Sequence, residues 1–155
     1  MQRQKLYVYA GSIWCLLFAL MSFYWAGGGM IGVRSLGGFI YQKALEREAS
    51  FIMLVWLTGI VKVCGGLFLL LLLGKWPRTI NRLLYSLSLL AGIFLFLYGM
   101  ANFLSLALSA FGLLALQVDN FALWWRLLFW EPFWMLGGVL VTLAAREFKK
   151  AAVTF

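Results

Sequence analysis

Four long runs of apolar residues divide the chain, and they predict four helices that cross a membrane. Crossing the hydrocarbon core, which is about 30 Å thick, takes roughly 20 apolar residues because an α-helix rises about 1.5 Å per residue. Runs of this length cover approximately residues 6–26, 51–73, 83–108 and 122–145. We therefore predict an all-α integral membrane protein, a four-transmembrane-helix bundle that forms a single domain over residues 1–155.

The segments between the runs predict connections of different kinds. Residues 27–50 form a long outer loop in which a glycine-rich part precedes a charged stretch, residues 41–48, that predicts a short surface helix. The third run continues beyond the length of one crossing, so residues 110–118 are expected to lie along the membrane interface. Asp119 or Asn120 is expected to cap the fourth helix, since either side chain accepts hydrogen bonds from free backbone N–H groups.

The composition excludes a soluble domain. Hydrophobic residues make up 65% of the chain and charged residues only 12%, whereas a soluble domain is about half apolar and about a quarter charged. The surplus apolar surface must face lipid, so membrane lipids are the first predicted partners. The formal net charge is +8, but the basic residues flank apolar runs and do not form a stripe for nucleic acid. No nucleic-acid partner is predicted.

The distribution of lysine and arginine predicts the orientation of the helices. Eight of these residues lie in the N-terminus, the second loop and the C-terminus, and three lie in the first loop, where two glutamates offset them. Short cytoplasmic loops carry the excess of positive charge in membrane proteins. Both termini are therefore expected on the cytoplasmic side (N-in, C-in) of a multi-pass protein in the cell membrane.

Neither a metal site nor a cofactor is predicted. The two cysteines, Cys15 and Cys64, lie inside apolar runs without CxxC spacing, and the chain contains no histidine. Zinc sites and thiol redox sites need such residues close together. Both cysteines are expected to be small packed side chains.

Small residues also predict how the first helix packs. They recur at steps of three and four residues, which places them on one helix face. A face of this kind lets another helix approach closely in a membrane. The face consists of Gly11, Cys15, Ala19, Ser22 and Ala26.

Two predicted helices each contain an ionisable residue deep in an apolar run. Lys62 lies eleven residues into the second run, close to the bilayer centre. Glu131 is the only acidic residue inside any run, and it lies at a similar depth in the fourth. A lone charge in hydrocarbon is costly, so each of these residues needs a partner. We predict that Lys62 and Glu131 lie within direct or water-bridged reach, either as a pair that only fixes helix packing or as part of a polar cavity.

Further polar and aromatic residues are expected near this pair. Arg126 precedes Glu131 by five positions, about 140° around an ideal α-helix, so it is a second-choice partner unless the kink at Pro132 rotates it. The third helix carries a polar stripe, and the first helix ends in aromatic residues. The candidate ligand-binding residues are Lys62, Glu131, Arg126, Asn102, Tyr98 and Trp25.

Two stretches of the chain resemble the signature of a known family. They are FYWAGGG at residues 23–29 and WRLLFWEPFWMLGG at residues 125–138. Both resemble signature stretches of a bacterial family of small four-helix membrane proteins that is known only as a domain of unknown function. The resemblance implies a bacterial cytoplasmic membrane but no activity. It marks as signature positions Trp25, Arg126, Glu131 and Pro132.

Three functions are compatible with these features. The first is binding or transport of a small amphipathic or lipid-like molecule in a polar cavity inside the membrane. The second is a membrane-embedded enzyme in which Glu131 gives or takes a proton. The third is an accessory subunit of a membrane complex, or a homo-oligomer, docked through its glycine-rich faces. The first is favoured because intramembrane charges are costly to keep and because no nucleophile, metal or cofactor motif supports an enzyme.

Overall fold

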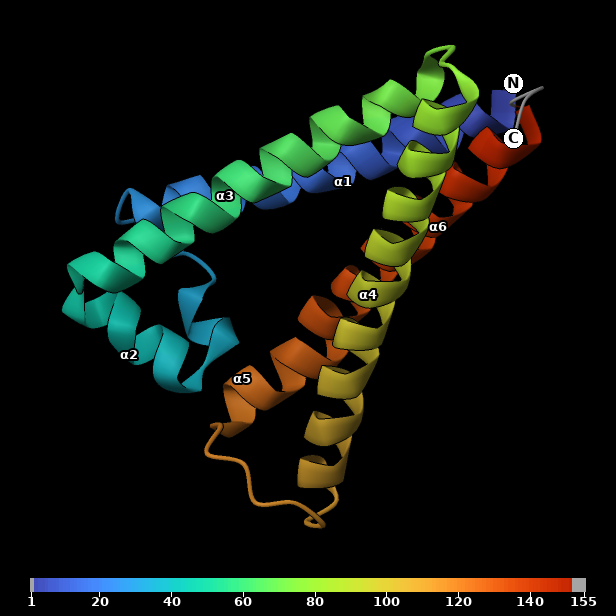
Figure 1. Cartoon of the computed structure of the whole chain (residues 1–155). Helices are drawn as coiled ribbons and strands as arrows, with labels where there is room; N and C mark the ends of the chain where they lie inside the picture. The colour runs from blue at the N-terminus through green and yellow to red at the C-terminus, as the bar shows by residue number, and fades with distance from the viewer. Residues whose placement is uncertain (1, 152–155) are drawn as a thin grey trace.

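The computed structural model describes residues 2–151 and is helical throughout its regular elements (Figure 1). Four helices are long and apolar enough to cross a membrane, which confirms the predicted fold class. The elements, in chain order, are α1 (Gln2–Ala26), the 3₁₀-helix η1 (Val33–Leu36), α2 (Gly38–Glu46), α3 (Ala49–Leu70), the 3₁₀-helix η2 (Leu71–Leu73), α4 (Arg78–Ala110), α5 (Asn120–Trp125), the π-helix η3 (Arg126–Trp130) and α6 (Glu131–Ala151).

Local sequence explains where these helices begin and end. A run of glycines follows α1, and Gly28 adopts a φ of 102°, which other residues rarely reach. Pro77 directly precedes α4, where its missing N–H costs no helical hydrogen bond. Asp119 caps α5, because its carboxylate accepts a hydrogen bond of 3.1 Å from the Ala122 N–H. The predicted cap at this position is therefore Asp119.

The four long helices overlap the predicted runs, but several bounds differ. The surface helix expected at residues 41–48 appears as α2, and η2 ends at Leu73, where the second run was expected to end. The third and fourth spans are longer than expected, since α4 runs from Arg78 to Ala110 instead of over 83–108, and α6 continues to Ala151 instead of ending at 145. Residues 111–119 are irregular and contain Gly112 with a φ of 70°.

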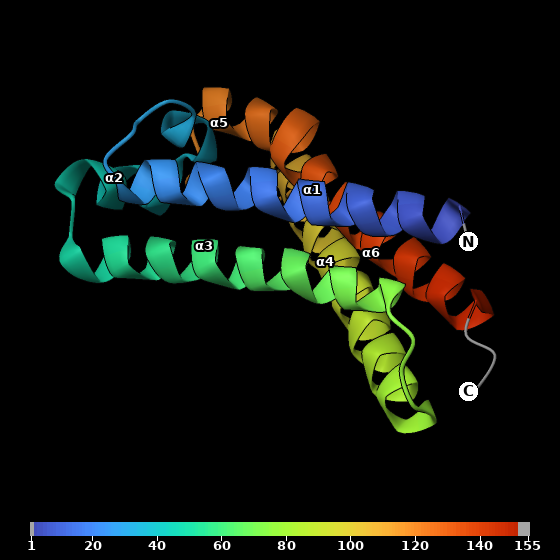
Figure 2. The same ribbon diagram turned by 90° about the horizontal axis from the view of Figure 1, so that it is seen from above.

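The long helices form two antiparallel pairs that diverge in a V (Figure 1). In one pair α1 packs along α3, and in the other α4 packs along α6. The two pairs meet where α1 contacts α6, whereas α3 and α4 make few contacts with each other (Figure 2). The helices α1 and α6 therefore form the centre of the molecule, with α3 and α4 on either flank.

Small residues let each pair pack closely. The predicted small-residue face of α1 is buried along its whole length. Ser12, which is next to Gly11 of this face, donates a hydrogen bond of 2.9 Å to the Gly66 carbonyl of α3. In the other pair, a Cβ added to Gly138 of α6 would lie 2.5 Å from the backbone nitrogen of Phe96 in α4. These helices therefore touch backbone to backbone, as glycine allows in membrane bundles.

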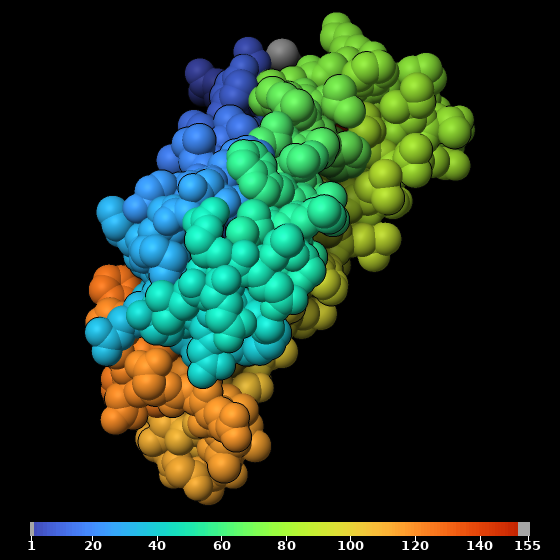
Figure 3. Space-filling view, turned by 90° about the vertical axis from the view of Figure 1, so that its left-hand side faces the viewer, coloured from blue at the N-terminus to red at the C-terminus, as the bar shows by residue number. Residues whose placement is uncertain are grey.

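The two ends of the molecule differ in what they contain. One end, which we call the terminal end, holds the start of α1, the connection from η2 to α4 and the end of α6 (Figure 1). The other, the loop end, holds η1, α2 and α5. Figure 3 shows α2 and its neighbouring loop covering this end between α3 and the start of the fourth span. Between the ends, large apolar side chains point outward, for example Met53, Leu57 and Val61 of α3.

The charge asymmetry between these two ends leads to a testable orientation. We expect the terminal end to face the cytoplasm, because it carries the excess of lysine and arginine. A reporter enzyme that is active only outside the cytoplasm should then stay inactive when it is fused after Phe155. In a chain without its native cysteines, a cysteine at Thr79 should escape an external thiol reagent, while one at Gln42 should react. The reverse labelling pattern would show the opposite orientation.

Candidate functional site

The ammonium group of Lys62 is held by neutral groups. Lys62 on α3 donates a hydrogen bond of 2.7 Å to the hydroxyl of Ser22 on α1. Its ammonium also lies 3.8 Å from the centre of the Phe18 ring and 5.9 Å from that of Trp134. Cations are attracted to the faces of aromatic rings, and more strongly away from water. Within residues 2–151, no carboxylate lies in ion-pair distance of Lys62.

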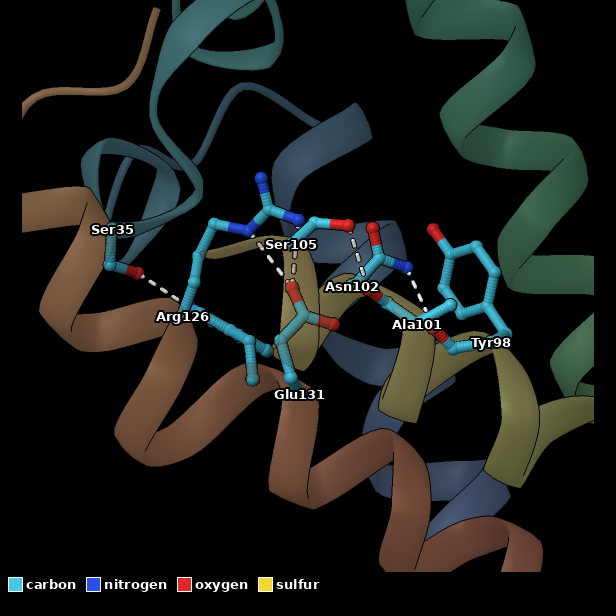
Figure 4. A network of polar contacts seen from close by, with 8 residues as sticks. Ser35, Tyr98, Ala101, Asn102, Ser105, Arg126 and Glu131 are labelled. Atoms are coloured by element: carbon cyan, nitrogen blue, oxygen red, sulfur yellow. Dashed lines mark hydrogen bonds and ion pairs between the residues drawn. The ribbon is translucent and has the colours of Figure 1, made fainter. Parts of the chain in front are cut away.

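A π-helix brings Arg126 and Glu131 together. The Glu131 N–H bonds the Arg126 carbonyl five residues earlier, in place of the four-residue step of an α-helix. This wider turn ends directly before Pro132, which has no N–H to give to the helix. Residues five apart then project from the same side. Accordingly, Nε and Nη2 of Arg126 donate to Oε1 of Glu131 at 2.9 and 2.7 Å (Figure 4).

A direct ion pair between Lys62 and Glu131, one of the two predicted forms of contact, is therefore absent from residues 2–151, and the water-bridged form stays a prediction. Lys62 bonds Ser22, and Glu131 bonds Arg126. The prediction assumed α-helical geometry, in which Arg126 would project away from Glu131. The kink at Pro132, which the sequence did suggest, takes the form of a π-turn and makes the second-choice partner the actual one.

Both of these polar groups line one cavity of about 450 Å³ toward the loop end. Its wall comes from α1, α2, α3, α4 and the fourth span, so every long helix contributes to it. Five of the six candidate residues line the cavity: Lys62, Glu131, Arg126, Tyr98 and Trp25. Most of the remaining wall is apolar or aromatic, including Phe18, Val55 and Trp134. We call this space the site cavity.

Asn102, the sixth candidate, does not line the site cavity. Its amide donates a hydrogen bond of 2.9 Å to the Tyr98 carbonyl of its own helix. Ser105 likewise bonds the Ala101 carbonyl at 2.9 Å. Figure 4 shows this part of the polar stripe of α4 beside the Arg126–Glu131 pair. The side chains of Asn102 and Ser105 are thus satisfied within α4, whereas Tyr98 lines the cavity.

A comparison with protein-family models identifies the family of the chain. Residues 15–141 match the model described as protein of unknown function (DUF3995). The chain belongs to the DUF3995 family. The match covers both stretches on which the sequence-based resemblance rests, and it confirms that the family is one without an assigned function. Neither the search of curated proteins nor the search of solved structures found a match for this DUF3995 protein.

Two side chains of the site in this DUF3995 protein were missed by the sequence reasoning. Ser22 was read only as a small packing residue, although its place on the same face as Cys15 and Ala26 put it toward α3. Arg47 follows α2 and lines the site cavity, and its guanidinium lies against Gly28, where no Cβ intervenes. No periodicity predicts such a contact, because both residues are in irregular segments.

Other loop cations of the protein lie away from the site cavity. Arg34 lies over the ring of Phe121, 5.0 Å from its centre. Lys43 forms an ion pair with Glu48, and this hydrogen bond raises the pKa of the lysine above its ordinary value. Arg47 is therefore the loop cation that reaches the cavity. No three potential metal ligands come together within residues 2–151.

A second, more apolar hollow of about 710 Å³ lies on the other side of α1 and the fourth span. Phe18 and Trp130 belong to the walls of both spaces. Trp130 is fixed by a hydrogen bond of 2.8 Å from its indole N–H to the Ser35 hydroxyl. These two rings therefore form the partition between the charged site cavity and the apolar hollow.

Proposed function

We propose that this protein resides in the cell membrane and binds an amphipathic, lipid-like molecule, with the polar end of the molecule in the site cavity. The observation that carries the proposal is the lining of this cavity. It combines an apolar wall with an ammonium, two guanidinium groups and a carboxylate inside a bundle of apolar helices. Charges in such a place are costly unless they are used or fully paired.

The size and position of the site cavity suit such a ligand. A volume of about 450 Å³ lies in the range of small-molecule sites, roughly 300–1,000 Å³. The cavity is bordered by α3 and α4, the two long helices that scarcely touch each other. An apolar tail can extend between them into the bilayer while the polar end stays among the charges. Binding of this kind serves either storage or transport across the membrane.

The enzymatic alternative has less support from the site. Glu131 is 3% exposed, and its Oε1 accepts two hydrogen bonds from Arg126. A general acid or base must reach its substrate, and here one carboxylate oxygen is already engaged by Arg126. Neither the buried Cys15 nor the exposed Cys64 lines the site cavity.

Photo-crosslinking tests the binding proposal. Benzoylphenylalanine at Tyr98, whose ring lines the site cavity, should form an adduct with a particular amphiphile that mass spectrometry identifies. The control position is Phe94, one turn earlier on α4, which is exposed and does not line the cavity. We expect the Phe94 adducts to follow the bulk lipid composition and the Tyr98 adducts to be dominated by one class. The same adduct pattern at both positions, or no adduct at Tyr98, would overturn the proposal.

A further inference from the structure

We propose that the site cavity selects an anionic amphiphile, a lipid whose phosphate-bearing head group has a net negative charge, which enters sideways between α3 and α4. This inference rests on the proposed binding function and adds the ligand class and the route. Its first basis is the charge of the cavity wall. Arg47, Lys62 and Arg126 line the cavity, and Glu131 is the only carboxylate among its lining residues. The wall therefore has more positive than negative groups.

The second basis is that Lys62 has only neutral partners. Its ammonium is held by one serine hydroxyl and by aromatic rings. In a medium of low dielectric constant, an ammonium without a nearby anion is costly. A ligand anion beside Lys62 would offset this cost, whereas a cationic or neutral head group would not.

The third basis is the geometry of Arg126. Its two hydrogen bonds to Glu131 end on a single oxygen atom and use only part of the donor set of the guanidinium. Its side chain keeps 23% of its surface exposed, against 3% for Glu131. Arg126 can therefore donate to a phosphate oxygen without leaving Glu131. A planar guanidinium together with a lysine ammonium is a common phosphate-binding combination.

The route follows from the arrangement of the helices. On one side of the cavity α1 and α6 are packed together, and at the loop end α2 lies over it. The flank between α3 and α4 lacks such packing, and cavity-lining residues of both helices, Thr58 and Tyr98, are exposed there. This flank lies between helices that are long and apolar enough to cross a membrane, so the proposal places it against lipid. A membrane lipid can therefore move in without leaving the bilayer.

A competition experiment in nanodiscs tests the ligand class. The full-length protein with benzoylphenylalanine at Tyr98 is placed in an equimolar mixture of phosphatidylglycerol and phosphatidylcholine with identical acyl chains. We expect the anionic lipid to predominate in the adducts on the order of tenfold, which corresponds to about 1.4 kcal/mol. Lys62→Met should bring the ratio close to one, and Lys62→Arg should keep it. Lys43→Met, which removes an equal charge outside the cavity, is the matched control and should leave the ratio unchanged.

The other possible results of this experiment would each overturn a stated part of the proposal. Equal adducts of the two lipids at Tyr98, but not at Phe94, would overturn the anionic selection and leave the binding proposal standing. If Lys43→Met reduces the lipid preference as much as Lys62→Met does, the preference comes from general surface charge. That result would overturn the site cavity as its source. Competition by inorganic phosphate or glycerol phosphate would show that a soluble anion is the ligand and overturn the lipid route. The absence of any Tyr98 adduct would overturn both proposals.

Discussion

Replacing Gly138 by alanine is expected to destabilise the protein by about 3 kcal/mol, because the added methyl group forces α4 and α6 apart. The new Cβ would lie 2.5 Å from the Phe96 nitrogen and 2.7 Å from the Gly92 carbonyl oxygen. Both are backbone atoms, so no rotamer change can relieve the clash. The helices would have to separate along the contact that aligns Arg126 and Glu131 with Tyr98.

The matched control is Gly65→Ala on α3. A Cβ at this position would meet only the Cys15 sulfur, at 3.8 Å, an ordinary contact. Both changes replace a glycine by alanine within a helix, so both raise the intrinsic helix propensity by the same amount. In a Cys64→Ser chain, reaction of the buried Cys15 with a thiol dye during heating reports unfolding. We expect the melting temperature to fall by about 10 °C for Gly138→Ala and to stay nearly constant for Gly65→Ala. Equal melting temperatures would contradict the close packing of α4 on α6.

The second large effect is expected from separating Arg126 and Glu131. Arg126→Met leaves a carboxylate that is only 3% exposed without its partner, and breaking a buried pair in this way costs about 3–5 kcal/mol. Glu131→Gln should lower the free energy of unfolding by less, because the Arg126 side chain is 23% exposed and can still reach other polar groups. The double variant should recover most of the loss, since it leaves no unpaired charge.

The comparison that decides this prediction is a double-mutant cycle. Thermal unfolding of the wild type, both single variants and the double variant gives the coupling energy of the pair. A parallel cycle with Lys62→Met and Glu131→Gln should give a much smaller coupling, because Lys62 bonds Ser22 instead. If the Lys62 cycle were the strongly coupled one, the pairing seen in the structure would be wrong.

Most of the fold could be predicted from the pattern of apolar residues. Transmembrane length is set by bilayer thickness, so the runs define the four helices to within a few residues. The small-residue face of α1 also correctly marked the surface that packs on α3. The V arrangement could not be predicted, because helix lengths and loop charges do not specify which helices pack side by side. It depends on individual contacts, such as that of Gly92 with Gly138.

The grouping of the candidate residues could be predicted better than their pairing, and their role in binding a ligand stays a prediction. Lys62, Glu131, Arg126, Tyr98 and Trp25 line one cavity, because polar residues at matching depths on packed helices come together. The pairing was missed because helical wheels assume one constant turn, and a π-turn changes the angle between residues. Pro132 was the available signal for this change. Arg47 could not be found in the same way, because its position depends on the course of an irregular loop.

The π-helix also affects how the chain tolerates changes of length. Geometrically, a π-turn resembles an α-helix with one residue inserted. Deleting one of residues 127–130 would restore α-helical geometry, in which four residues cover nearly the same arc as the five residues of the π-turn. The helices on either side would keep nearly the same faces toward the bundle, so Ala122 and Leu123 would stay buried. A single deletion in this segment is therefore expected to be tolerated better than one inside α3 or α4, where all residues beyond the deletion would turn by about 100°.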